Sequence, residues 1–357
     1  MPEIVGPSLI IETNVSPLEA HLGHLRYLAN PAAARDLLRC EFGFTAKDAR
    51  DDSRLFCAQI EQSIHFYEQS KNASIRTRPV LQYYCYLNLA VAAILAYRPA
   101  NWTQYRSHGV EDKTHGLQRI DLASKVLKVR KGAVPLFHSI LSDVDLKSRT
   151  FRFGALVAGI QMLSSELGDQ FGKPTQRIFV SDAIVEDAGR FYSQVSFNSY
   201  IRGAPNPIAY KRLEDAMPLL SSDYARDRAA RNPIIYKSIA SWTSADAASA
   251  PHRVSCMKLI NYGGHSVKRG QMGVSSRYAW SGVSRLPLLP TLTSLLLLSF
   301  SLASIVRYRP ALLNAALDSP YRLLIDTFVL ESDAMFIPAL RNLLYRQEVS
   351  IGPLDYM

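Results

Sequence analysis

The chain has 357 residues, of which 48% are hydrophobic and 20% are charged. This balance predicts a globular protein with a sizeable core, in one large domain or two, and excludes a disordered chain. Lys and Arg outnumber Asp and Glu by 41 to 31, which gives a formal net charge of +10. Such a charge favours contact with phosphates, nucleic acid or an acidic protein, although a basic surface without any such partner is equally compatible with it.

The N-terminal part of the sequence predicts a series of helices. Ser16 and Pro17 mark a capped helix start, and this helix should end before Asn30–Pro31. A second short helix should run from there to about Gly43. A third helix should begin at Thr45, and apolar residues at helical spacing predict its buried face: Leu55, Phe56, Ile60, Ile64 and Tyr67.

A fourth helix should begin at Pro79, because proline is favoured at the first helical position, and should end at Pro99. It follows two arginines, Arg76 and Arg78, and is apolar along most of its length. The predicted buried face consists of Val80, Leu81, Tyr84, Leu87, Val91 and Leu95.

The stretch "KVLKVRKG", from Lys125 to Gly132, alternates basic and apolar residues. In an extended conformation, Val126, Lys128 and Arg130 would share one face, while Lys125, Leu127, Val129 and Lys131 would lie on the other. We expect an edge strand that either contacts phosphates or is simply solvated, with lysines that block pairing to other strands.

The middle of the chain has the composition of strands. The stretches "QRIFVSDAIVEDAGRFYSQVSFNSYIR" and "RVSCMKLINYGGHSVKRGQMGVSSRYAW" are rich in Val, Ile, Phe and Tyr and are interrupted by Gly and Asp. Loop and short helix should separate them. The glycine-rich part, with Lys268 and Arg269, lacks the residue order of a phosphate-binding loop and predicts a basic hairpin.

A long uncharged stretch, "LPLLPTLTSLLLLSFSLASIV", precedes Arg307. Pro290 should hold the helix start to Thr291, leaving roughly 16 residues, or about 24 Å, against a hydrocarbon core of about 30 Å. We therefore interpret it as a buried central helix with no membrane contact. Further helices should begin at Ser319–Pro320 and at "IPALRNLLYRQ".

Together these elements predict an α+β protein that is predominantly helical with a β-rich middle portion. The expected organisation is a helical portion with a short basic β segment at 1–174, the β-rich portion at 175–285, and a C-terminal helical portion at 286–357 that packs on the first.

The four cysteines, Cys40, Cys57, Cys85 and Cys256, form no CxxC pair and have no histidine at metal-ligand spacing. We expect buried free thiols, no metal and no cofactor. The N-terminus lacks the features of a secretory signal, so we expect a cytoplasmic protein.

Three separated stretches resemble the YaaC-like family of bacterial cytosolic proteins: "IRTRPVLQYYCYLNLAVAAIL", "SHGVEDKTHGLQRIDLASKVLKVRKGAVPLF" and "LLLLSFSLASIVRYRPALL". They occur in the same order in that family, which has no settled activity. The resemblance therefore bears on the fold rather than on the function.

The first half also resembles, more faintly, the HEPN class of helical nucleotide-binding and ribonuclease domains. The stretches "QYYCYLNLAVAAIL" and "KTHGL" are similar to its tyrosine-rich helix and to the loop that follows. In that class a nearby Arg and His cleave RNA without a metal. Here Arg106 and His108 are closer together, and Arg130 and His138 further apart, than the class pattern requires.

Candidate site residues follow from these segments. Arg76 and Arg78 precede a helix N-terminus, where free N–H groups and the helix dipole favour a phosphate. Alternatively, they pair with Glu61 or Glu68 on the preceding helix. We expect the helix start to open into a basic cleft shared with the loop that contains His108.

His108 and His115 are candidate catalytic residues that would transfer protons in phosphodiester cleavage, with Lys113 or Arg119 stabilising the charge on phosphorus. Capping of helices or turns is the alternative role for both histidines. Further candidate nucleic-acid contacts are Lys128, Arg130, Lys268 and Arg269.

Two other groups have both a structural and a binding interpretation. Arg307 and Arg309 complement the dipole at the end of the apolar helix. Tyr308 and the Tyr83–Tyr84 pair either stack on bases or belong to the core.

The sequence contains no GxSxG, HExxH or kinase signature, which argues against hydrolases of those types. We predict a nucleic-acid or nucleotide binding protein, RNA more than DNA, which would act as an RNA-directed effector in a bacterial antiviral or stress system. The alternative is a non-enzymatic scaffold subunit that binds an acidic protein partner, as an oligomer or within a larger complex.

Overall fold

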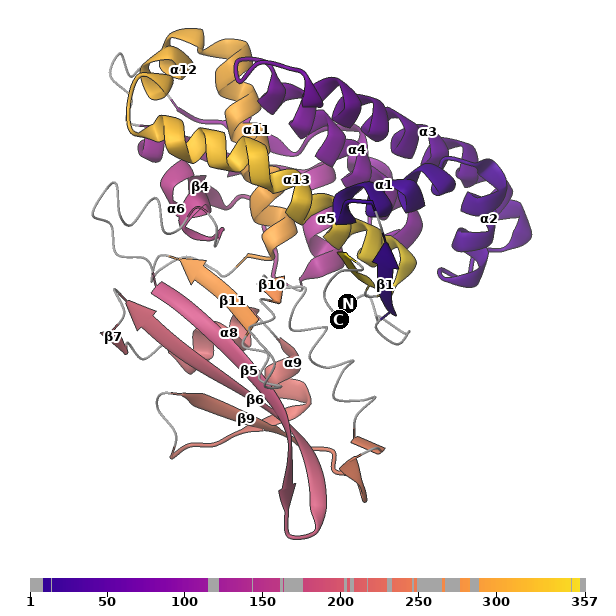
Figure 1. Ribbon diagram of the computed structural model, residues 1–357, viewed down its shortest axis with the longest axis vertical. Helices are drawn as coiled ribbons and strands as arrows, with labels where there is room; N and C mark the ends of the chain where they lie inside the picture. Colours follow the sequence, from indigo (N-terminus) through magenta and orange to yellow (C-terminus); the bar gives the residue numbers. More distant parts are fainter. Residues whose placement is uncertain are drawn as a thin grey trace. The chain divides into compact units, whose positions relative to one another are not determined.

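The computed structural model shows an α+β protein that is predominantly helical (Figure 1). It describes residues 9–13, 15–114, 122–142, 144–160, 163, 176–201, 204–205, 209–216, 218–229, 233–245, 247–248, 265–266, 277–282, 289–347 and 349–353. Two compact units are present. One contains Leu141–Val144 and Gly154–Ser294, and the other contains Pro2–Ile140, Asp145–Phe153 and Leu295–Met357.

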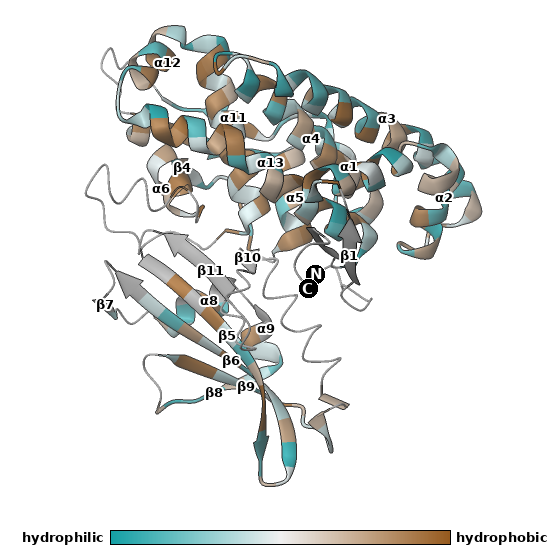
Figure 2. Cartoon of the chain, in the orientation of Figure 1, coloured by the Kyte–Doolittle hydropathy of each residue, from teal (hydrophilic) through white to brown (hydrophobic). Residues whose placement is uncertain are grey.

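The helical unit begins with α1 (Pro17–Leu28), α2 (Pro31–Cys40) and α3 (Ala46–Lys71). The predicted caps are confirmed, since the Ser16 side chain accepts a hydrogen bond from the Glu19 amide and the Thr45 side chain accepts one from the Asp48 amide. Polar and apolar residues both occur along α3 (Figure 2). Its predicted buried face is confirmed except at Leu55, which is exposed.

Helix α4 (Arg78–Tyr97) is buried on a different face from the predicted one. Val91 and Leu95 are buried as expected, but Val80, Leu81, Tyr84 and Leu87 are only half-buried. The innermost residues of its first half are polar or aromatic: Gln82, Tyr83, Cys85 and Tyr86. Nearly every position of α4 is apolar, so spacing alone did not identify the side that packs inward.

Three C-terminal helices complete the unit, which takes up the chain again at Leu295. They are α11 (Thr291–Tyr308), α12 (Pro310–Leu317) and α13 (Tyr321–Tyr345). The prediction of a buried helix from Thr291 is confirmed. The prediction of a separate last helix is wrong, because α13 continues through Pro338. Two of the described helices, α4 and α11, meet the length and composition of a membrane span, but 72% and 78% of their spans are buried.

A small antiparallel sheet has the strand order β2-β3-β4. The strands are β2 (Val110–Asp112), β3 (Val126–Val129) and β4 (Thr150–Arg152). The expectation of an edge strand at 125–132 is wrong, because β3 is paired on both sides. Short helices flank this sheet: η1 (Trp102–Arg106), η2 (Leu122–Ser124) and α5 (Ala133–Leu141).

The other unit is built on an antiparallel sheet with the order β10-β11-β5-β6-β9-β8. A two-residue turn at Ala188–Gly189, both with positive φ, joins β5 (Gln176–Asp187) to β6 (Arg190–Ile201). The remaining elements are α6 (Phe153–Ala158), β7 (Ala204–Pro205), α8 (Tyr210–Ala216), α9 (Pro218–Ser222), β8 (Tyr224–Arg226), β9 (Ile234–Ser238), β10 (His265–Ser266) and β11 (Arg277–Gly282).

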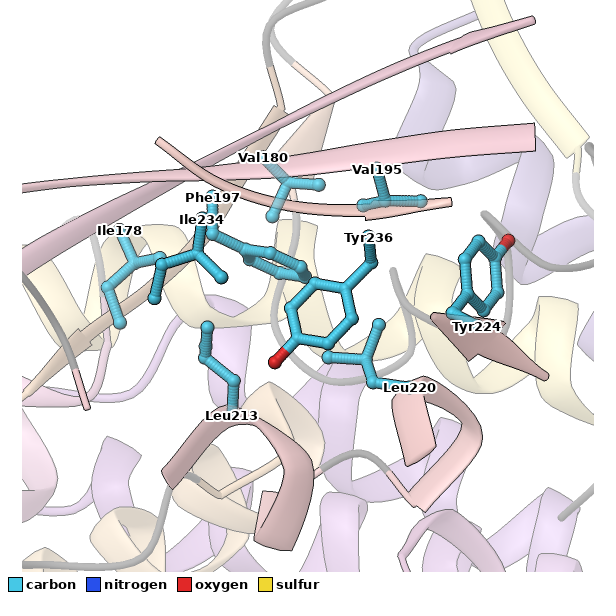
Figure 3. Close-up of a cluster of buried hydrophobic side chains, with 9 residues drawn as sticks. All are labelled: Ile178, Val180, Val195, Phe197, Leu213, Leu220, Tyr224, Ile234 and Tyr236. Carbon is cyan, nitrogen blue, oxygen red and sulfur yellow. The ribbon is translucent and has the colours of Figure 1, made fainter. Parts of the chain in front are cut away.

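One face of this sheet is covered by α8 and α9. Strand side chains point toward Leu213 and Leu220 on these helices and form a buried apolar cluster (Figure 3). Within it, the Tyr236 hydroxyl donates a hydrogen bond to Glu214 (3.1 Å), which satisfies the polar end of a buried ring. The strand prediction for 176–202 is thus confirmed.

Near the termini, β1 (Leu9–Thr13) and β12 (Val349–Pro353) form a parallel two-stranded sheet. This pairing joins the two ends of the helical unit.

Candidate nucleic-acid interface

Side chains from three segments gather where α11 ends. We call Tyr84, His108, Arg307 and Tyr308 the aromatic–arginine cluster. Arg307 donates a hydrogen bond to the Tyr84 hydroxyl (Nη1–Oη 3.0 Å). Its guanidinium carbon lies 5.8 Å from the centroid of the Tyr84 ring and 5.0 Å from that of Tyr308, within cation–π distance of both. Tyr308 is 71% exposed, so the cluster opens to solvent.

His108 forms the inner side of the cluster. Its Nδ1 is hydrogen-bonded to the Tyr83 hydroxyl, and the two rings stack with their centroids 5.5 Å apart. Burial, with a further contribution from the charge of Arg307, lowers the pKa of His108. The imidazole is therefore neutral at neutral pH. Among the described residues, Nε2 has no hydrogen-bond partner, so this nitrogen is available to a ligand.

Two glycines fix the backbone around His108. Gly132 has a φ of +147°, and a Cβ there would lie 2.5 Å from both the Ser107 carbonyl oxygen and the Gly109 nitrogen. Gly109 has a φ of +76°, and a Cβ there would lie 2.8 Å from Pro135 Cδ. The amides of Ala133 and Val134 donate to the carbonyls of Ser107 (2.8 Å) and His108 (3.1 Å). This close approach holds His108 against α4.

A buried ion pair joins Asp112 on β2 to Lys125, the residue before β3. Asp112 Oδ2 accepts hydrogen bonds from Lys125 Nζ (2.7 Å) and Ser304 Oγ (2.9 Å), and Oδ1 accepts one from Thr114 Oγ1 (2.6 Å). The Lys125 side chain is fully buried. Burial raises the pKa of Asp112, but the bonds from Lys125 and Thr114 outweigh burial and lower it to about 2.

Arg309 extends the basic surface. It donates to the Thr114 carbonyl, and its Nε lies 3.9 Å from Asp112. Because Lys125 already neutralises Asp112, the group formed by Asp112, Lys125 and Arg309 carries a net positive charge. The excess charge is on Arg309, which is partly exposed.

Arg76, which precedes α4, and Arg78, its first residue, have different partners from those predicted. Arg78 pairs with Asp333 on α13 (Nη2–Oδ2 3.4 Å), and Arg76 donates to Asn314 on α12. Glu68 instead pairs with Arg26 (2.6 Å) and Lys71 (3.1 Å). Among the described residues, no hydrogen bond or ion pair connects Arg76 or Arg78 to His108.

The other predicted site residues lie in several places. Lys113 and Arg130 both pair with Glu111 on β2, and Lys128 is half-buried in the central strand β3. His115, Arg119, Lys268 and Arg269 lie outside the described residues. Of the predicted catalytic residues and predicted cationic contacts that the structure describes, only His108 lies in the aromatic–arginine cluster.

The sequence indicates base stacking as one role for Tyr84 and Tyr308, but no pattern in it places Arg307 and His108 together. Nor did it single out Asp112 or Asp333. The available signal was the set of three stretches that carry the YaaC-like resemblance, since each stretch contributes a residue to the cluster.

Comparison with known proteins gives one match. Neither the curated proteins nor the solved structures contain a match to the chain. The family described as YaaC-like protein matches residues 26–343, which include all of the aromatic–arginine cluster. On this match over most of its length, the chain belongs to the YaaC-like protein family.

Proposed function

We propose that this protein binds nucleic acid in the cytoplasm, through the aromatic–arginine cluster. The observation that carries the proposal is the placement of Arg307 between two tyrosines. In the described part of the chain no carboxylate pairs with Arg307, whose hydrogen bonds go to the Tyr84 hydroxyl and the Ala303 carbonyl. Its charge is therefore available to a phosphate.

Exposed Tyr308 supports binding of unpaired bases. A tyrosine that is 71% exposed offers a ring face on which a base can stack, and stacking requires no particular sequence. Arg309 and Arg76 add positive charge on neighbouring elements, and the net charge of +10 adds long-range attraction. These features favour a single strand over a duplex.

The resemblance to the HEPN class supports RNA over DNA and an effector role in an antiviral or stress response. A second candidate function, metal-independent RNA cleavage, is favoured by the proximity of neutral His108 and charged Arg307. In that reaction His108 would accept the proton of a ribose 2′-hydroxyl as this oxygen bonds to the adjacent phosphorus. The bond from phosphorus to the 5′-oxygen of the next nucleotide would break, this oxygen would take a proton from solvent, and Arg307 would stabilise the charge on the phosphate oxygens.

A binding titration tests the proposal. Fluorescent single-stranded RNA, single-stranded DNA and duplex RNA of equal length would be titrated with the full chain at two salt concentrations. We expect the tightest binding to single strands and a steep loss of affinity with salt. Absence of binding at low salt would refute the proposal, and preferential binding of a polyglutamate control would favour the acidic-protein alternative.

Cleavage is tested separately. Labelled RNA would be incubated with the protein in the presence of a chelator, with Arg307→Gln and His108→Gln as variants. We expect cleavage by the wild type only, whereas binding without cleavage would leave a non-catalytic binding protein.

A further inference from the structure

The C-terminal end of α13 faces α1 around a second arginine. We call Arg341, His21, His24, Tyr345 and Gln347 the Arg341 cluster. Arg341 is 4% exposed and stacks on the Tyr345 ring, with its guanidinium carbon 4.3 Å from the ring centroid. All these residues belong to the helical unit and lie on elements distinct from the aromatic–arginine cluster.

The partners of Arg341 are all neutral groups. Nε donates to His24 Nδ1 (3.0 Å), and Nη1 donates to the Asn342 side chain (3.2 Å) and the Gln347 carbonyl (3.4 Å). Within the described ranges no aspartate or glutamate forms an ion pair with Arg341. Buried guanidinium groups in proteins are normally paired with an anion, because desolvation of an uncompensated charge is unfavourable.

Two further observations indicate an incomplete site. Nη2 of Arg341 donates no hydrogen bond to a described residue, and this nitrogen is not completely buried. His21 is 3% exposed, and its Nδ1 has no hydrogen-bond partner among the described residues. A buried cation with a free donor and a buried imidazole with a free nitrogen thus lie in one cluster.

We propose that the Arg341 cluster binds a small oxyanion, a phosphate or a carboxylate group, on the Nη2 edge of Arg341. An oxyanion supplies both the missing countercharge and the missing acceptor. It also allows a neighbouring imidazole to take up a proton and donate to the same anion. Nothing in this proposal depends on nucleic-acid binding.

The position of Arg341 near the end of α13 offers a competing explanation. Its bond to the Gln347 carbonyl and its charge both suit a helix C-terminus, which requires no ligand. The two explanations differ in their response to added anion, because a structural arginine gains nothing from phosphate.

The test compares thermal unfolding of the full chain in inorganic phosphate, in acetate and in chloride at equal ionic strength. We expect phosphate or acetate to raise the melting temperature in a saturable way. The anion that does so shows whether the site prefers a phosphate or a carboxylate group. Arg341→Gln should remove this saturable increase. Arg341→Lys keeps the positive charge and so preserves the fold. It should lower the affinity for the anion by roughly tenfold or more, because lysine lacks the guanidinium group that binds an oxyanion through two N–H donors.

Arg322→Gln is the matched control, since Arg322 is exposed on α13 and pairs with Asp326, away from both clusters. It should keep the full response to phosphate. An equal response to all three anions in the wild type, or an undiminished response in Arg341→Lys, would overturn the proposal. Loss of the response in Arg307→Gln would assign the anion to the aromatic–arginine cluster and overturn it as well.

Discussion

Arg78, at the first turn of α4, forms an ion pair with the buried carboxylate of Asp333 on α13. Asp333 also accepts hydrogen bonds from Gln82 (3.1 Å) and Tyr86 (2.7 Å), so this group connects the two helices through the core. Removal of Arg78 would leave the Asp333 charge without its countercharge. We expect Arg78→Ala to lower the free energy of unfolding by about 3–5 kcal/mol, measured by urea denaturation.

A double-mutant cycle provides the control. Burial raises the pKa of Asp333, because the folded state disfavours its ionised form. The contribution of Asp333 to the free energy of unfolding therefore decreases as pH rises above its unfolded pKa of about 4. Asp333→Asn removes that charge. Combined with Arg78→Ala, it should recover most of the lost stability, and an additive loss would contradict the ion pair.

The Asp112–Lys125 pair predicts an acid-labile element in the helical unit. The pKa of Asp112 is lowered to about 2, so its contribution is fully present above the unfolded value of about 3.9 and is lost as pH falls toward 2. We expect Asp112→Asn to lose about 2–3 kcal/mol at pH 7, the free energy that corresponds to this shift, much of which comes from the pairing with Lys125. Urea denaturation at several pH values checks this.

Two variants separate the charge effect from packing. Ser304→Ala removes a neutral donor to Asp112 and should cost about 1 kcal/mol. The double replacement Asp112→Leu with Lys125→Met should be more stable than Asp112→Asn, because no buried charge remains. If Asp112→Asn unfolds no more easily than Ser304→Ala, the pair does not stabilise the fold.

Local signals in the sequence sufficed for the helix starts. Ser16 and Thr45 cap their helices through bonds to amides three residues ahead, so the information lies within one turn. The hairpin of β5 and β6 is equally local, with its turn at Ala188–Gly189. These elements could be predicted because few distant residues are needed to specify them.

Non-local relationships could not be predicted in the same way. The partner of Arg78 lies on α13, far along the chain, and the neighbours Asn314 and Asp333 have no sequence pattern that connects them to α4. Likewise, a proline normally interrupts a helix, but α13 continues through Pro338 because the helix is packed in the core on both sides of it. Arg307 and His108 meet only because α11 and the segment after η1 both pack on α4.

The Arg341 cluster predicts loss of stability in mild acid. Burial, with the charge of Arg341 and of His24, lowers the pKa of His21 to about 4, and burial and Arg341 lower that of His24. Between pH 6.5 and 4 the unfolded chain therefore binds more protons than the folded chain. The stability that is present above pH 6.5 is lost as the pH falls toward 4. The loss from His21 should be about 3 kcal/mol.

His21→Leu tests this assignment. His24, whose pKa is lowered as well but less strongly, keeps its own contribution in this variant, and Tyr345 remains protonated throughout this range. Unfolding by urea at pH 7.5 and 5 should therefore show a much smaller pH effect in the variant. An unchanged pH effect would place the acid sensitivity elsewhere in the protein.

Gly132 predicts a sharp contrast between two alanine substitutions. Gly132→Ala would place a methyl group 2.5 Å from backbone atoms of Ser107 and Gly109, at a φ of +147°. We expect a loss of about 2 kcal/mol or more and a displaced His108. Gly23→Ala on α1, where no atom lies within 4 Å, should instead gain about 0.5–1 kcal/mol. Thermal unfolding of both variants measures the difference.

Tyr308 and Arg307 predict separable effects on nucleic-acid binding. Tyr308 is 71% exposed, so Tyr308→Ala should leave the melting temperature nearly unchanged. The same variant should weaken the binding of single-stranded RNA by about 1–3 kcal/mol, whereas Tyr308→Phe, which keeps the ring, should bind almost normally. Arg307→Gln should reduce the slope of log affinity against log salt by about 1, because one phosphate contact is lost.

Matched controls are available on the same unit. Tyr27 is 65% exposed on α1, and Arg322 is exposed on α13 in an ion pair with Asp326. Tyr27→Ala and Arg322→Gln remove the same side-chain types away from the cluster, so both should keep wild-type affinity and salt slope. If these two controls weaken RNA binding as much as Tyr308→Ala and Arg307→Gln do, binding reflects the overall positive charge of the protein. The aromatic–arginine cluster is then not the site.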